Sequence, residues 1–163
     1  MKDVESLFKS FMYAFKGLWW MLTHERNFRI HITCLCYMFY YLLRYDFFTV
    51  TNTQLAILLL ASGLVIGGEM LNTGIEKAND SVSREKRDTI AVSKDVSAGA
   101  VLVFAVSAVL CGVAILWQPD AFSALFAHYA DNPLNILKFI LSVAVFTLFI
   151  FKFDFKNRKK DKE

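Results

Sequence analysis

The sequence predicts an all-α integral membrane protein, for three reasons. It is strongly apolar, its apolar residues gather in long segments, and its positive charges fall mainly on one side of these segments. Hydrophobic residues make up 56% of the 163 residues, and the mean hydropathy is +0.41. Soluble domains are nearer half apolar. We therefore expect an N-terminal interfacial helix, three membrane-spanning helices and a fourth, C-terminal span.

Residues 4–22 are expected to form the interfacial helix. Apolar side chains recur there every three or four residues, while Glu5, Lys9 and Lys16 lie on the opposite side. This period is typical of an amphipathic helix. The adjacent Trp19 and Trp20 suit the boundary between membrane and water. The alternative is a helix that packs on a soluble core.

Four apolar segments follow, and we expect spans at about 28–45, 54–79, 95–117 and 134–152. The third reaches the ~20 residues that cross a bilayer. The first two gain length from flanking residues, among them Arg44, which can extend its charge to the interface. Residues 1–117 would form the main membrane domain, and residues 118–163 would add the extra span and a basic tail.

The positive charges predict which side of the membrane each connection occupies. Of the 18 Lys and Arg residues, all except Arg44 and Lys138 fall on one side when four spans alternate. By the positive-inside rule, both termini and the segment 81–94 should be cytoplasmic. The connection 118–133 has no Lys or Arg and is expected to be an exterior loop.

A stripe of polar and acidic residues extends from the second span. At about 100° per residue, its members fall within roughly a third of a turn of one another: Glu69, Asn72, Thr73, Glu76 and Asp80. Ionisable groups at membrane depth normally pair, bind a cation or serve a reaction. Carboxylates on one helical face would repel each other unless a cation lies among them.

The topology brings two other charged clusters to the same membrane surface, one around Glu25 and one from Arg84 to Asp95. Separate carboxylates with nearby cations suit a divalent metal that bridges polyphosphate oxygens, and magnesium needs few protein ligands. The sequence has no G-x-x-x-x-G-K-[ST] loop of the soluble nucleotide-binding folds. Two structural alternatives stay open: Glu25 pairs with a neighbouring arginine, or Ser93 or Asp95 caps the third span.

These motifs resemble the signature of the bacterial diacylglycerol kinase family, over about residues 5–117. The match rests on Glu69-Met-Leu-Asn72-Thr73-Gly-Ile-Glu76, then Asp80, then Lys94-Asp95-Val-Ser-Ala-Gly-Ala-Val. The resemblance implies a small membrane kinase that acts as a homotrimer. It also implies that ATP and Mg2+ bind at the cytoplasmic surface and that the lipid alcohol enters from the bilayer.

The resemblance also implies roles for individual residues. Glu69 would be the catalytic base, and Glu25 and Glu76 would bind the metal. The expected contacts of the nucleotide are Tyr13, Asn72, Glu85, Lys86, Arg87, Lys94 and Asp95.

The segment from His24 to His31 bears on the acceptor. Its E-R-N-x-x-x-H pattern resembles the undecaprenol kinases of Gram-positive bacteria more than diacylglycerol-specific enzymes. We therefore favour undecaprenol, with diacylglycerol as the alternative. A non-catalytic oligomeric scaffold or channel is the rival of another class. We expect a bacterial cytoplasmic membrane protein with its active site facing the cytoplasm and no nucleic-acid partner.

Overall fold

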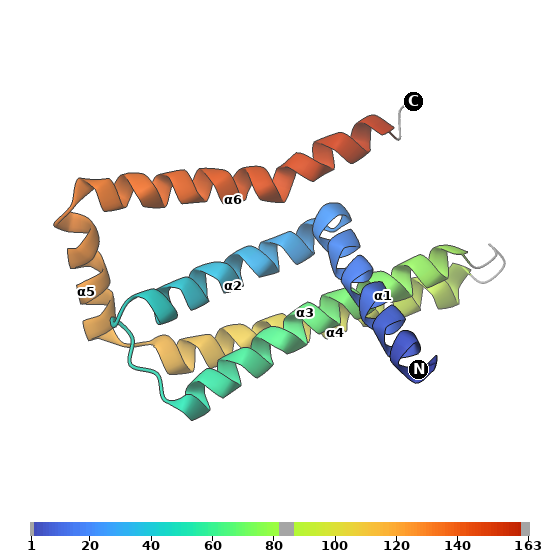
Figure 1. Cartoon of the computed structure of the whole chain (residues 1–163), viewed down its shortest axis with the longest axis horizontal. Coiled ribbons are helices and arrows are strands. Elements are labelled where there is room, and N and C mark those ends of the chain that lie inside the picture. Colours follow the sequence, from blue (N-terminus) through green and yellow to red (C-terminus); the bar gives the residue numbers. More distant parts are fainter. Residues whose placement is uncertain (1, 82–86, 161–163) are drawn as a thin grey trace.

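Helices make up almost all of the computed structural model, which describes residues 2–81 and 87–160 (Figure 1). Within these ranges there is no strand, so the predicted all-α class is confirmed. The helices are α1 (Lys2–His24), α2 (Arg26–Arg44), α3 (Asn52–Ser81), α4 (Arg87–Leu116), α5 (Pro119–Ala130) and α6 (Pro133–Lys160).

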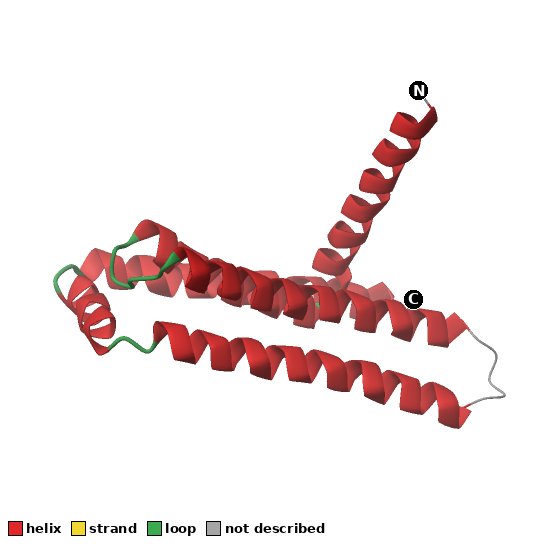
Figure 2. Cartoon of the chain, turned by 90° about the horizontal axis from the view of Figure 1, so that it is seen from below, coloured by secondary structure: helices red, strands yellow, loops and turns green. Residues whose placement is uncertain are grey.

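The long helices form a bundle around α2 and α3. Helices α3 and α4 run antiparallel and pack along their length, and α2 lies between α3 and α6 (Figure 1). The short α5 closes one end of the bundle, while the end of α6 lies toward the other end. Helix α1 projects steeply from the bundle (Figure 2). The ammonium group of Lys77 lies 5.5 Å from the centre of the Trp20 ring and links α3 to α1.

Among the described residues, three helices are long and apolar enough to cross a membrane. They lie at Asn52–Ser81, Asp88–Leu116 and Pro133–Phe151, with mean hydropathies of 1.8, 2.7 and 2.3. Helix α2 matches the expected helix at 28–45 but is not among these candidates, so its span stays a prediction. On α1, apolar side chains such as Phe8 and Trp19 are exposed, which fits a helix in the membrane interface.

Two expectations about connections were wrong. The segment 118–133 is not simply a loop, because α5 occupies most of it. Pro119 lies in the first turn, where a helix tolerates proline, and the Phe122 ring packs edge-on against Phe48 and Trp117.

The other correction concerns the start of α4, which begins at Arg87 instead of near residue 95. Ser93 and Asp95 therefore lie inside the helix and cannot cap it. The charged residues before the apolar run were expected to be a loop, yet charges do not stop a helix. Asp88 in the first turn favours one through the positive end of the helix dipole.

An aromatic cavity of about 370 Å³ lies between α2, α5 and α6. Tyr37 bonds to Ser142 at 2.9 Å, and the Tyr41 hydroxyl bonds to that of Tyr129. These hydrogen bonds between residues that line the cavity join the C-terminal half of α2 to α6 and α5.

Candidate active site

Glu69 is the most deeply placed carboxylate of the stripe, with 4% of its surface exposed. It follows Gly68 on α3, and both residues face the interior of the bundle. The Asn27 side chain, in the first turn of α2, interacts favourably with the Glu69 carboxylate across the two helices. A buried charge needs such a partner, because leaving it unsatisfied is costly. The contact therefore fixes α2 against α3 at this depth.

Two further carboxylates act on Glu69 electrostatically, Glu25 and Glu76. Glu25 occupies the extended residue before α2, and no side-chain bond caps the helix from there. Its carboxylate lies near the positive end of the α2 dipole, which favours a negative charge. Glu25 and Glu76 thus lie within electrostatic range of Glu69.

Glu76 is held by a short network between α3 and α4. The amide nitrogen of Asn72 donates to the Glu76 carboxylate at 3.2 Å. The Ser97 hydroxyl donates to the Asn72 carbonyl oxygen at 2.6 Å and lies 2.9 Å from the backbone carbonyl oxygen of Lys94. Because both ends of the Asn72 amide are used, Asn72 orients Glu76.

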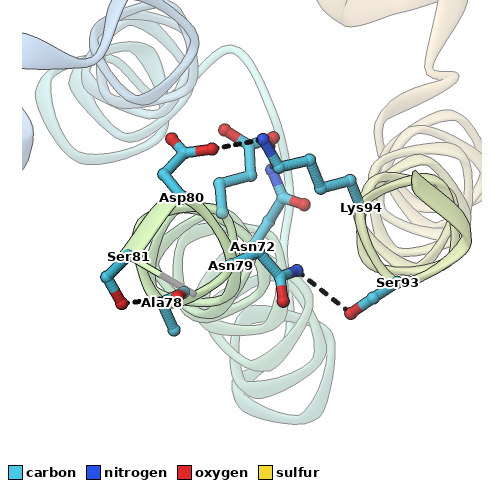
Figure 3. Close-up of polar contacts among 8 residues, drawn as sticks. Asn72, Ala78, Asn79, Asp80, Ser81, Ser93 and Lys94 are labelled. Atoms are coloured by element: carbon cyan, nitrogen blue, oxygen red, sulfur yellow. Dashed lines mark hydrogen bonds and ion pairs between the residues drawn. The ribbon is translucent and has the colours of Figure 1, made fainter. Parts of the chain in front are cut away.

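Nearer the end of α3, two more contacts join it to α4 (Figure 3). The Lys94 ammonium donates to Asp80 at 2.5 Å, and the Asn79 amide donates to the Ser93 hydroxyl at 3.2 Å. The Lys94 and Asp80 side chains are 36% and 55% exposed. An ammonium group has three donors, so Lys94 can keep this contact and still meet an anion from water.

Two other predicted nucleotide contacts, Tyr13 and Asp95, lie exposed on their helices. Tyr13 is 64% exposed on α1, where the Lys16 ammonium lies 5.6 Å from its ring centre. Asp95 is exposed on α4. Glu85 and Lys86 lie outside the described residues, and so does the side chain of Arg87, where α4 begins.

Sequence reasoning assigned no role to Asn27 or Ser97, although both contact the predicted site. A signal existed for each. Asn27 belongs to the E-R-N-x-x-x-H segment that begins at Glu25, and Ser97 lies three residues after Lys94, on the same face of a helix. What the sequence lacked was the packing of α2 and α4 on the stripe of α3.

The carboxylates suit magnesium only with help from a substrate. Among the described residues, no three His, Cys, Asp or Glu side chains form a ready metal site. Magnesium commonly takes one or two carboxylates and completes its six oxygens with water and substrate phosphates. Glu25 and Glu76, both near Glu69, fit that incomplete set.

Comparison with known proteins shows what the chain is similar to. The family model described as prokaryotic diacylglycerol kinase matches residues 12–116. The undecaprenol kinase of Bacillus subtilis (strain 168) is 32% identical over 113 residues, which cover 69% of this chain and 89% of that protein. The diacylglycerol kinase of Synechocystis sp. (strain ATCC 27184 / PCC 6803 / Kazusa) is 34% identical over 115 residues, 70% of this chain and 64% of that protein. No solved structure gives a significant match.

Proposed function

Because the chain belongs to the prokaryotic diacylglycerol kinase family, it is a membrane lipid kinase with ATP as phosphoryl donor, and we propose that its acceptor is undecaprenol. The reaction would convert the terminal hydroxyl of this lipid to a phosphate monoester. Membership of a kinase family favours an enzyme over a scaffold or channel.

The segment Glu25 to His31 supports this acceptor. It carries the E-R-N-x-x-x-H pattern, and its Asn27 contacts the buried Glu69. A similar undecaprenol kinase aligns over 89% of its length. Diacylglycerol stays the alternative, because the similarity to a diacylglycerol kinase is comparable in identity.

The burial of Glu69 carries the mechanistic proposal. A lipid hydroxyl arriving from the bilayer would meet this carboxylate before it meets water. The hydroxyl oxygen would form a bond to the γ-phosphorus, the bond from that phosphorus to the β,γ-bridging oxygen would break, and ADP would leave. Phosphoryl transfer needs mainly positioning and charge neutralisation. Glu69 would accept the hydroxyl proton as the new bond forms.

Glu25 and Glu76 would hold Mg2+ at the aqueous side of Glu69. When bound, the ion would neutralise charge on the β- and γ-phosphate oxygens. Asn72 would keep one Glu76 oxygen in place through its 3.2 Å bond. The remaining carboxylate oxygens would be available for metal binding.

Lys94 would contact the phosphates from α4. Its bond to Asp80 holds the ammonium group over the end of the stripe, and its partial exposure leaves it accessible from water. A positioned cation there would stabilise the charge of the transition state. The exposed Asp95 and Tyr13 and the segment Glu85 to Arg87 would supply further nucleotide contacts.

We also propose a cytoplasmic active site and a homotrimer. The charge distribution supports the orientation, because the end of α3, the start of α4 and the end of α6 lie toward one end of the bundle (Figure 1). Helices α4 and α6 bury 6% and 0% of their apolar windows within one chain, which leaves faces for lipid or for further copies.

A panel of acceptors tests the proposed function. Purified protein would be incubated with labelled ATP, Mg2+ and equal amounts of undecaprenol, farnesol, diacylglycerol or ceramide in the same detergent. We expect the highest kcat/KM with undecaprenol. A higher value with diacylglycerol would assign the alternative activity instead.

A further inference from the structure

Arg29 is completely buried, although arginine is rarely placed so. It lies in the first turn of α2. Its Nε donates to the backbone carbonyl of Ile150 at 2.9 Å, and its Nη1 donates to the backbone carbonyl of Leu22 at 3.3 Å. A single side chain therefore joins α2 to α6 and to the end of α1.

Both acceptors make physical sense. Leu22 lies in the last turn of α1, where carbonyl groups lack helical partners and where a cation is favoured by the helix dipole. Ile150 lies well inside α6, so its carbonyl is carried by a rigid element. A planar guanidinium can satisfy two carbonyls in fixed directions, which an ammonium group does less well.

The tie to α6 does not depend on this contact alone. Tyr37 bonds to Ser142, and its ring lies 5.1 Å from that of Phe146. Helix α6 thus contacts α2 at several points between Phe139 and Ile150. It lies wholly beyond the matched residues 12–116, so it is an addition to the part of the chain that defines the family.

The residues beside Arg29 are those that approach Glu69. The backbone N–H of Arg29 donates to the carbonyl of Glu25 at 3.3 Å, and Asn27 lies between them in sequence. Fixing Arg29 from α1 and α6 therefore fixes the corner between α1 and α2, which carries the Glu25 carboxylate and the Asn27 amide.

We propose that Arg29 is a positioning residue through which α6 holds Glu25 and Asn27 in place against Glu69. The proposal rests on the proposed roles of Glu25 in metal binding and of Glu69 as base. It makes the C-terminal helix a working part of the kinase, beyond its role as a membrane anchor.

Substitution of Arg29 in the full chain tests the first half of the proposal. Arg29→Gln and Arg29→Lys would be purified as folded fractions, and kcat and the Mg2+ concentration for half-maximal activity would be measured per folded molecule. Residues that orient metal ligands typically contribute about 10- to 100-fold to affinity or activity. We expect a rise of that order in the Mg2+ requirement for Arg29→Gln and a smaller rise for Arg29→Lys.

Arg44→Gln, at the opposite end of α2, is the matched control and should keep wild-type constants. A purely structural role would lower the yield of folded Arg29 variants without changing their constants. A folded Arg29→Gln or Arg29→Lys variant with wild-type constants overturns the proposal. Should Arg29→Gln fail to fold, the Arg29→Lys result decides.

Helix α6 is tested by Phe151→Pro against Phe151→Ala. Proline at 151 removes an N–H and clashes with the carbonyl of Thr147, so it displaces the turn that presents the Ile150 carbonyl. Alanine leaves the backbone in place. We expect Phe151→Pro to raise the Mg2+ concentration for half-maximal activity as Arg29→Gln does. A variant that carries both substitutions should need little more Mg2+ than either single variant, because both break the same contact. Normal constants in folded Phe151→Pro overturn the role of α6.

The same assays separate this proposal from the proposed function. If Glu69→Gln keeps wild-type turnover, the assignment of the base is wrong. If Glu69→Gln is inactive while the Arg29 and Phe151 variants behave as wild type, the base assignment stands and only the positioning role is wrong.

Discussion

The Asn27 side chain and the Glu69 carboxylate interact across the two helices, and this contact joins the first turn of α2 to the buried carboxylate of the α3 stripe. Asn27 is thus a polar partner of Glu69, the proposed base, at a position where Glu69 is almost fully buried. It also connects the segment that resembles undecaprenol kinases to the carboxylate that would take the proton.

Asn27→Ala should therefore impair chemistry more than nucleotide binding. Loss of a polar partner of a charged group typically costs about 1.5–3 kcal/mol, so we expect kcat to fall about 10- to 100-fold with little change in the KM for ATP. Steady-state kinetics at saturating lipid measure both. Asn52→Ala, at the other end of α3, should be unaffected. A raised KM with normal kcat would place Asn27 at the nucleotide instead.

Glu76→Gln should raise the Mg2+ concentration needed for half-maximal activity, because it removes one of two proposed ligand charges while keeping the bond from Asn72 possible. We expect an increase of about 10-fold or more. A magnesium titration at fixed ATP measures it. Asp120→Asn on α5 is the control for a lost carboxylate elsewhere. An unchanged titration would remove Glu76 from the metal site.

Gly68→Ala tests how tightly α3 and α4 pack beside Glu69. A Cβ atom at this position would lie 2.6 Å from Cδ2 of the Phe104 ring, whereas one at Gly67 meets nothing within 4 Å. Overpacking typically costs about 1–3 kcal/mol. Thermal unfolding in detergent should show a lower Tm for Gly68→Ala and an equal or higher Tm for Gly67→Ala. Equal Tm values for the two variants would contradict this packing.

Binding of ATP with Mg2+ should protect the chain between Ser81 and Asp88 from protease if Glu85, Lys86 and Arg87 contact the nucleotide. Cleavage rates would be compared with ATP alone, with Mg2+ alone and with both. Protection only by the combination supports these contacts. Equal cleavage under all conditions would exclude them.

The sequence predicted the long helices and the acidic stripe well, because period and hydropathy are local properties. Glu69, Asn72 and Glu76 share a face by helical geometry alone, whatever packs on them. The boundary of α4 was missed because charged residues near a helix start are compatible with both loop and helix. Helix α5 was missed because a short segment without Lys or Arg was interpreted as an exterior loop.

Contacts between distant segments could not be predicted in the same way. The bond of Arg29 to Ile150 joins residues 121 positions apart, and no local pattern signals it. The burial of Arg29 could not be predicted either, because an arginine in a charged segment at the membrane surface is expected to be exposed. For Tyr13, the expected contact with the nucleotide came from the family resemblance and not from a local pattern. Within one chain, Tyr13 lies exposed on α1.

Glu69→Gln tests the central claim most directly, because it replaces the carboxylate by an amide of the same shape. Transfer from labelled ATP to undecaprenol would be measured for wild type, Glu69→Gln and the surface control Glu5→Gln, with nucleotide binding measured in parallel. Loss of a general base typically costs about 10²- to 10⁴-fold. We predict a loss of that size for Glu69→Gln with near-normal nucleotide affinity and a normal rate for Glu5→Gln. Wild-type turnover in folded Glu69→Gln would contradict the account.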